Sequence, residues 1–347
     1  MACRGHTRGG EAARIPRVSH MTQSIPFGAR STADQVLAGV DLTRKRMVVT
    51  GCRSGIGLET MKALVANGAH VIGLAQTLED ARAACDAAGN WSTPIACDFA
   101  DFDSIGSAAD SICDLPGPLD AIITTTELGN LSGRKGRCDI ELQSIVEYIG
   151  HFALVNRLAE RVRNNGGRIV MVCGDVIANR APADQAARDD LGSRHLYEPL
   201  VSGGPAKSAL AIYAKELSRR LAARGVLVNL FDAGIIRAAG LDEDAGWTPR
   251  MIALIARLFT KSAAQRAATA ALLAASPQVA GISGENWSNC QISPADPLLT
   301  DEIVAKRLWD TSEQIVFAIR AANRIVLQGA AQERAAADRR SLIGVAD

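Results

Sequence analysis

Short apolar runs alternate with helix-length amphipathic segments along most of the chain. The segment 46–76, RMVVTGCRSGIGLETMKALVANGAHVIGLAQ, contains a β-branched run, a glycine-rich turn, an amphipathic helix and a second apolar run. Further strand-like runs follow at 94–97, 119–124, 168–173 and 226–231, separated by helical segments rich in Ala, Leu and Arg. Strands that alternate with helices predict an α/β fold: a Rossmann-type, doubly wound parallel sheet in a single domain.

One stretch departs from this alternation of strands and helices. Residues 235–276 predict a lid-like insertion, within which 248–259 forms an amphipathic helix. The apolar face of that helix consists of Met251, Ile252, Ile255, Leu258 and Phe259. Packing on the sheet is favoured for this face, and a wall for an apolar substrate or a contact between subunits of a homo-oligomer are the alternatives. After it, we expect an edge strand near 278–281 and a C-terminal amphipathic helix at 301–321.

Both ends of the chain are expected to lie outside the folded domain. Residues 1–24 lack apolar periodicity and helix caps, which predicts a flexible N-terminal extension, and Met21 is a second plausible start of translation. Residues 25–325 carry the strand and helix pattern of the single α/β domain. Residues 326–347 predict a polar tail, frayed from residue 332 onwards.

Composition and charge exclude several function classes. Among 347 residues, 38 are Lys or Arg and 37 are Asp or Glu, and the resulting charge of +1 lacks the basic excess of a nucleic-acid-binding domain. The eight cysteines form no CxxC pair and no cluster with histidine at zinc spacing, which predicts reduced thiols and no metal site. No apolar stretch predicts a signal-peptide core or a membrane span, so we expect a cytoplasmic protein.

The clearest chemical motif is the glycine-rich turn at 50–57, TGCRSGIG. It follows a strand and opens a helix, so its glycines allow a tight turn and let backbone N–H groups approach a pyrophosphate at the helix N-terminus. The residues expected to contact a dinucleotide here are Gly51, Arg53, Ser54, Gly55, Ile56 and Gly57. In isolation, this spacing of glycines is weak evidence for dinucleotide binding. Between a predicted strand and a predicted helix, it is strong evidence.

The TGxxxGIG spacing resembles the cofactor signature of the short-chain dehydrogenase/reductase family, from about residue 25 to 321. The segments IPFGARSTADQVLAGVDLTRKRMVVTG, GISGENWSNCQISP and DEIVAKRLWDTSEQIV are similar to the branch of retinol-dehydrogenase-like and protochlorophyllide-reductase-like enzymes. The resemblance implies that Asp98 contacts the adenine amino group, with an acidic helix cap as the alternative, and that the backbone of Phe99 follows. It also implies that Lys207, Gly234 and Ile236 lie at the nicotinamide half of the cofactor.

The end of the second strand bears on the choice of cofactor. A carboxylate there would accept hydrogen bonds from the adenosine ribose and favour NAD, but this strand ends at Gln76. No carboxylate at that position repels a 2′-phosphate, and Arg53 is placed to pair with one, unless it is an ordinary solvated arginine. The sequence therefore favours NADP, with NAD as the alternative.

The part of the predicted site where the nicotinamide would meet the substrate, called the reacting end below, departs from the family pattern. The family's tyrosine, which exchanges a proton with the substrate oxygen, stands four residues before its lysine; here Lys207 is preceded by Gly203. Gly174 stands at the place of the family's serine and Glu147 at that of its helix asparagine, and the NNAG turn reads TTTE at 124–127. Glycine can neither donate nor accept a proton through a side chain, so the usual carbonyl reduction is not predicted.

Four residues are candidates for catalytic work: Lys207, Ser202, Cys173 and Tyr197. Ser202 and Cys173 flank the two vacated positions and would act as weak donors or nucleophiles if a neighbouring charge lowered the pKa of either. Tyr197 lies six residues before Gly203 and reaches its place only if the loop between them is rebuilt. Ordinary packing is the favoured interpretation for these last three.

Two functions remain open from the sequence. The first is an atypical NADP-dependent oxidoreductase, or a non-redox enzyme on the same scaffold, that acts on a hydrophobic small molecule without the usual tyrosine. The second is a catalytically inert binding or scaffold protein in which the nucleotide is a stabilising or regulatory ligand. The retained cofactor residues and the apolar lid region favour the enzyme, although a fold alone does not establish a function.

Overall fold

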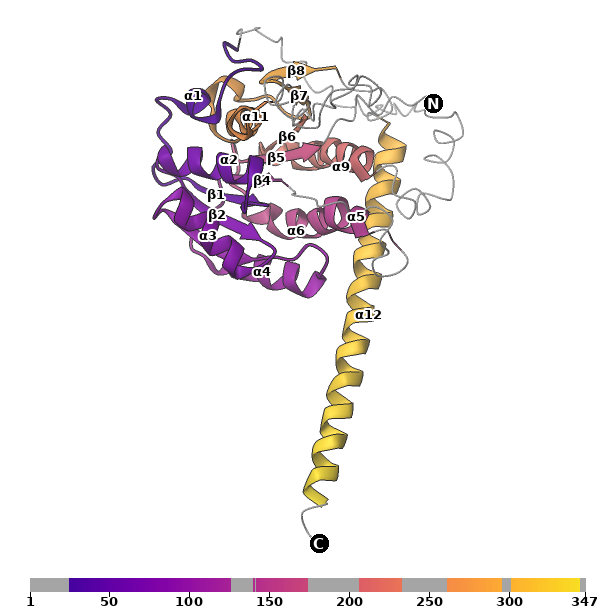
Figure 1. Ribbon diagram of the computed structural model, residues 1–347. Coiled ribbons are helices and arrows are strands. Elements are labelled where there is room, and N and C mark those ends of the chain that lie inside the picture. Colours follow the sequence, from indigo (N-terminus) through magenta and orange to yellow (C-terminus); the bar gives the residue numbers. More distant parts are fainter. Residues whose placement is uncertain are drawn as a thin grey trace, which may run out of the picture.

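A computed structural model describes residues 25–125, 140, 142–173, 206–232, 261–294 and 301–343, and it describes side chains within these ranges except those of 206–208 and 324–343. These residues form a twisted sheet with helices on both faces and one long helix that leaves the body (Figure 1).

The eight strands form a single sheet in the order β3-β2-β1-β4-β5-β6-β7-β8. Their bounds are β1 Arg46–Thr50, β2 His70–Ala75, β3 Ser92–Ala96, β4 Ala121–Thr124, β5 Arg168–Cys173, β6 Leu227–Asp232, β7 Asn286–Ser288 and β8 Gln291–Ser293. All neighbouring strands pair in parallel except β7 and β8, which form an antiparallel hairpin. The fold is therefore the predicted Rossmann-type α/β fold, and its strand order reverses between β1 and β4, where such sheets bind ligands.

Two hydrophobic cores lie on opposite faces of the sheet because successive strand residues point to opposite sides. Val48 and Ile72 belong to one core, whereas their neighbours Val49 and Val71 belong to the other. The first core contains α4 (Phe102–Asp114), α6 (Gly150–Leu158) and α9 (Ala206–Leu221), and the second contains α1 (Ala33–Leu37), α2 (Gly55–Ala66), α3 (Leu78–Ala88) and α11 (Ala263–Ala275).

Two predictions about the last third of the fold were wrong. Residues 277–279 form a 3-10 turn with Pro277 in its first position and Ser276 as its cap. The strand that follows β6 in the sheet is the later β7, and β8 forms the edge. The predicted lid 235–276 was also too long, since α11 begins within it at a capping box of Ser262 and Gln265. Eight residues of α11 are buried, so this helix is part of the core and not of a lid.

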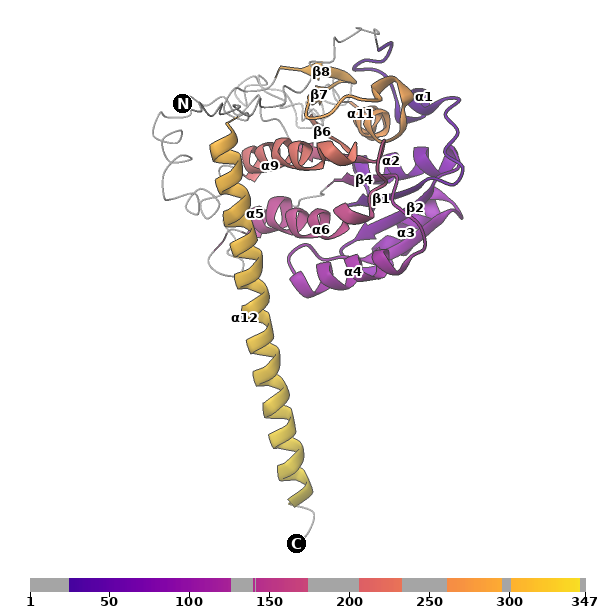
Figure 2. The same cartoon turned by 180° about the vertical axis from the view of Figure 1, so that it is seen from behind.

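The C-terminal helix is longer than predicted. α12 (Glu302–Ile343) continues beyond residue 321 and through the stretch from 332 that was expected to fray. Ala, Arg, Glu and Gln predominate there and no proline follows Pro297, so the local sequence favours a helix although it is polar. Figure 2 shows the second half of α12 running away from the body, while its first half lies beside α9.

Candidate functional site

The glycine turn lies between β1 and α2, as predicted. Gly51 and Gly55 have φ angles of 60° and 58°, which glycine adopts without strain. A Cβ atom on Gly57 would lie 2.2 Å from the carbonyl oxygen of Gly51, and one on Gly51 would lie 2.5 Å from the carbonyl oxygen of Thr125. Gly51 and Gly57 therefore have no room for a side chain, and the turn is folded closely onto the first residues of α2, where helix N–H groups lack intrahelical acceptors.

Two buried threonines fasten this turn to the end of β4. The backbone N–H of Thr125 donates to the Thr50 hydroxyl oxygen (3.0 Å), and that hydroxyl donates to the carbonyl oxygen of Thr125 (2.6 Å). The Thr125 hydroxyl in turn donates to the carbonyl oxygen of Thr50. These reciprocal hydrogen bonds join the two strands at the point where the sheet order reverses.

His151, from α6, connects the glycine turn to two further segments. Its ring stacks on Phe99, with 4.1 Å between the ring centres and 9° between the planes. Its Nε2 lies 3.3 Å from the hydroxyl oxygen of Thr50, and its Nδ1 lies 2.9 Å from the carbonyl oxygen of Val146. Burial lowers the pKa of His151 to about 4, so the ring is neutral at neutral pH. This histidine is therefore suited to positioning the turn and not to exchanging protons near neutral pH.

The predicted adenosine contacts come together at the ends of β2 and β3. The side-chain amide of Gln76 donates to a carboxylate oxygen of Asp98 over 3.2 Å. The other oxygen of Asp98 accepts the backbone N–H of Ala100, whereas the N-cap of α4 is Asp101. The helix-cap alternative for Asp98 is therefore wrong, and its carboxylate shapes the turn that leads to Phe99.

Arg53 projects from the glycine turn toward the start of α3. Its side chain is 68% exposed, and its Nε lies 3.3 Å from a carboxylate oxygen of Asp80. Asp80 is held in turn by Thr77, the N-cap of α3. Arg53 thus stands beside the end of β2 with a carboxylate partner, and sequence reasoning missed Asp80 because the contact joins two separate βα turns.

The described part of the reacting end contains Cys173 and Glu147. Cys173 ends β5 and is buried. Glu147 lies in η2 (Ile145–Ile149), one turn of π-helix that runs directly into α6, and accepts a hydrogen bond of 3.0 Å from Gln143. Single π-helical turns are rare and occur frequently at functional sites. The turn places a carboxylate four residues before His151, at the position that the sequence identified as changed.

Several predicted site residues lie outside the described residues: Gly174, Tyr197, Ser202, Gly203, Gly234 and Ile236. Lys207 lies in the first turn of α9, and its side chain is not among those described. The assignments of these residues therefore stay predictions. The structure brings together Gly51, Gly57, Thr50, Thr125 and His151 at one end of the site and Gln76, Asp98 and Arg53 at the other.

This described half fits the pyrophosphate and adenosine of a dinucleotide. Glycines without space for a Cβ open a helix N-terminus for phosphate, and a polar pair lies at the neighbouring strand ends. Among the described residues, no group of three His, Cys, Asp or Glu side chains is arranged to hold a metal ion. In the same part of the chain, no helix combines the length and hydrophobicity needed to cross a bilayer.

Comparisons with known proteins agree with this geometry. Residues 45–185 match the family model for short chain dehydrogenases. A probable oxidoreductase of Streptomyces antibioticus is 33% identical over 272 residues, which cover 73% of this chain and 87% of the relative. Mouse retinol dehydrogenase 14 is 28% identical over 293 residues, or 78% and 86% of the two chains. The crystal structure of a Burkholderia cenocepacia short chain dehydrogenase in complex with NADP is similar in fold, with a TM-score of 0.53 and 24% identity over 72% of this chain and 97% of its own.

Proposed function

The chain belongs to the short-chain dehydrogenase/reductase family, in its retinol-dehydrogenase-like branch, and we propose that it binds NADP(H) and acts on a hydrophobic small molecule without the tyrosine proton donor of that family. The observation that carries this proposal is the contrast within one site. The glycine turn is packed so tightly that Gly51 and Gly57 leave no room for a Cβ, whereas Gly203 stands where the phenol would be. A protein that must bind the nucleotide but does not use the usual proton transfer would keep the tight turn and could lose the tyrosine.

The preference for NADP rests on charge near the end of β2. Gln76, a neutral residue, follows that strand, and the Arg53 guanidinium lies within reach of Asp80 at the start of α3. A 2′-phosphate carries more charge than the single Asp80 carboxylate, and arginine can bind it with two parallel hydrogen bonds. Arg53 would exchange Asp80 for the phosphate at low cost, since an exposed ion pair is worth at most about 1 kcal/mol.

The residues of this chain divide the work as follows. The glycine turn binds and orients the pyrophosphate, and the Gln76–Asp98 pair binds the adenosine. Lys207 holds the nicotinamide ribose, as the family pattern implies. When bound, the cofactor supplies or accepts a hydride. Because Gly203 cannot move a proton, the substrate is one that needs no phenol at its oxygen. It is either an iminium, which a hydride converts to an amine without a proton, or an activated alkene, which takes its proton from water or from the substrate itself after the hydride has added.

A second function is favoured by the number of changed groups at the reacting end. Gly203, Gly174, Glu147 and the TTTE turn all depart from the family pattern. An inert binding or scaffold protein in which the nucleotide is a stabilising ligand accounts for these changes without any chemistry. The double substitution Gly203→Tyr with Gly174→Ser tests the geometry of the site: a gain of carbonyl reduction identifies a decayed reductase whose cofactor geometry is preserved, and no gain favours a repurposed or cofactor-free site.

Calorimetric titration with NADPH and separately with NADH tests the proposal before any substrate is known. We expect NADPH to bind and to bind more tightly than NADH. The matched control is Gly57→Ala, which places a methyl group in the glycine turn and should remove the binding heat. If neither nucleotide binds the native protein, the oxidoreductase proposal fails. Consumption of bound NADPH with electrophilic apolar substrates then distinguishes an enzyme from an inert nucleotide-binding protein.

A further inference from the structure

The first half of α12 is held to the body in a defined rotation. Trp309 packs against Phe152 and Tyr213, with ring centres 5.2 Å and 5.6 Å apart. The hydroxyl of Ser312 lies 2.7 Å from that of Tyr148, deep in the same contact. Aromatic packing of this kind fixes which side of the helix faces the protein. The side of α12 that faces outward is therefore also determined.

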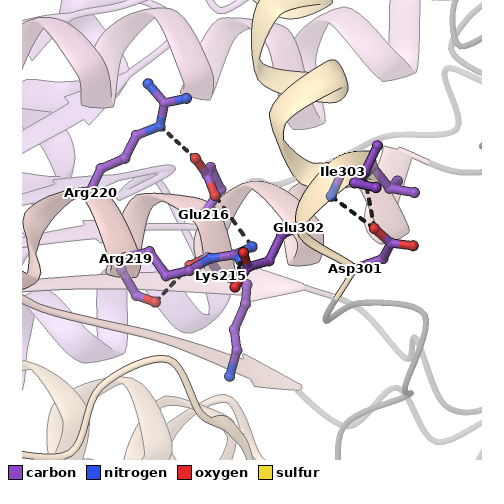
Figure 3. A network of polar contacts seen from close by, with 9 residues as sticks. Lys215, Glu216, Arg219, Arg220, Asp301, Glu302 and Ile303 are labelled. Atoms are coloured by element: carbon purple, nitrogen blue, oxygen red, sulfur yellow. Dashed lines mark hydrogen bonds and ion pairs between the residues drawn. The ribbon is translucent and has the colours of Figure 1, made fainter. Parts of the chain in front are cut away.

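The ion pairs at the start of α12 add to this attachment (Figure 3). Arg219 of α9 bridges Glu216 of the same helix (3.3 Å) and Glu302 of α12 (2.9 Å). Arg220 also contacts Glu216, and its guanidinium carbon lies 3.7 Å from the centre of the Trp309 ring. A surface cavity of about 670 Å³ lies between the two helices at this point, and Ile303 forms part of its rim.

Two large apolar side chains lie on the outward side of α12. Ile303 is 67% exposed and Phe317 is 75% exposed, and they are two of only five large hydrophobic residues exposed in the described part of the chain. At about 100° per residue, positions 303, 310 and 317 form one stripe along the helix. This stripe lies about 160° from the buried stripe of Ala305, Ser312 and Ile319. The exposed pair is therefore aligned along the face that points away from the protein.

Charges of opposite sign accompany this stripe. Lys306 and Glu313 are both exposed and lie seven residues apart, which places them on the same flank of the helix. The midpoint between Lys306 and Glu313 falls between residues 309 and 310, and that between Ile303 and Phe317 falls at Asp310. The outward face is thus nearly symmetric about Asp310, with Ile303 matched by Phe317 and Lys306 by Glu313, whereas Arg307 on the other flank is matched by the neutral Gln314.

From this symmetry we infer that the outward face of α12 binds a second copy of this chain, with the two helices antiparallel about a two-fold axis near Asp310. In that arrangement Ile303 of each copy packs on Phe317 of the other, and Lys306 of each pairs with Glu313 of the other. A parallel pairing would instead place these flanks on opposite sides of the helix pair and keep Lys306 apart from Glu313, so the charge pattern favours the antiparallel one.

The expected dimer is weak. One pair of helices in contact over about four turns buries less surface than a standard stable interface, and interfaces of that size are typical of transient association. The two Asp310 side chains also approach each other near the axis, and like charges weaken the contact. We therefore expect monomers at low concentration and dimers in the upper micromolar range.

Sedimentation equilibrium of the full chain, over a concentration series of about 1 to 200 µM, tests this inference. We expect a monomer–dimer equilibrium that Phe317→Asp shifts to monomer by at least about tenfold. Trp91→Asp is the matched control, because Trp91 is 67% exposed next to the edge strand β3 and its substitution should leave the equilibrium unchanged. A chain that is monomeric throughout, or a dimer that Phe317→Asp leaves intact, overturns the inference.

Charge reversal tests the antiparallel register. Lys306→Glu and Glu313→Lys should each weaken the dimer about tenfold, because each places like charges opposite one another, and the double variant should restore it. Asp310→Asn should strengthen the dimer by removing the repulsion at the axis. Thermal unfolding, which needs no ligand, confirms that these exposed substitutions keep the fold. A double variant as weak as either single one contradicts this register.

Discussion

The pyrophosphate end and the reacting end of the predicted nucleotide site differ in how tightly their residues are constrained by packing. At the pyrophosphate end, Gly57 has no space for a Cβ, Thr50 and Thr125 exchange hydrogen bonds, and His151 is buried against Phe99. At the reacting end, the sequence predicts that Gly203 and Gly174 occupy the positions of the family's tyrosine and serine. A close-packed end tolerates few substitutions, whereas the loss of a catalytic group need not affect packing. If the predicted assignments hold, this difference explains why the binding end keeps the family pattern while the reacting end departs from it.

The largest expected effect comes from Gly57→Ala. Its Cβ would lie 2.2 Å from the carbonyl oxygen of Gly51, so the turn must move. We expect NADPH affinity to fall by more than about 100-fold and the free energy of unfolding to fall by about 2 to 3 kcal/mol. The control is Gly106→Ala in α4, where a Cβ would meet no atom within 4 Å. That substitution should stabilise the helix by up to about 1 kcal/mol.

Calorimetry measures the first effect, and urea unfolding measures the second. Equal NADPH binding by Gly57→Ala and the native chain would show that the turn does not contact the nucleotide.

His151→Phe should have the next largest effect, and its signature is a changed pH dependence. The pKa of His151 is about 4 in the folded protein, below the value near 6.5 of an unfolded chain. Between these values the unfolded state binds more protons, so His151 makes stability fall as the pH drops from about 6.5 to 4, by up to about 3 kcal/mol. Phenylalanine keeps the stack on Phe99 but removes this titration.

Urea unfolding at pH 7.5 and pH 5 tests this prediction. The native protein should lose about 2 kcal/mol more than His151→Phe between these two values. Equal losses in the two proteins would mean that His151 is protonated normally in the folded state.

Arg53→Ala should have a smaller effect, confined to one cofactor. We expect affinity for NADPH to fall about tenfold and affinity for NADH to stay the same, because only NADPH carries a 2′-phosphate. Stability should change by less than about 0.5 kcal/mol, since Arg53 and Asp80 form an exposed pair. Asp80→Ala is the opposite test and should raise NADPH affinity. An equal loss of affinity for both nucleotides would argue that Arg53 contacts the pyrophosphate instead.

Glu147→Gln should have the smallest effect on nucleotide binding. The substitution removes a charge in the π-helical turn and keeps the shape of the side chain and an acceptor for Gln143. We expect the dissociation constant for NADPH to change by less than about twofold, which calorimetry measures. A large change would show that the two ends of the site are coupled.

Neighbouring residues in the chain were enough to predict the α/β class and the glycine turn. Strand and helix periodicity, glycines with positive φ and a turn between strand and helix are all local properties, visible within a few residues. The same local reasoning failed at 277–279, where an apolar residue after Pro277 belongs to a 3-10 turn, and in the last turns of α12, where polarity was mistaken for fraying.

Only the tertiary structure placed Asp80 beside Arg53, His151 beside Thr50 and Phe99, and Thr125 beneath the glycines. These contacts join residues 27 to 101 positions apart, and which of them meet depends on the order in which the strands pair. The sequence by itself determined the local turns and the chemical groups present, because those depend on neighbouring residues. The sheet decided which groups meet, because long-range contacts follow from strand order and packing.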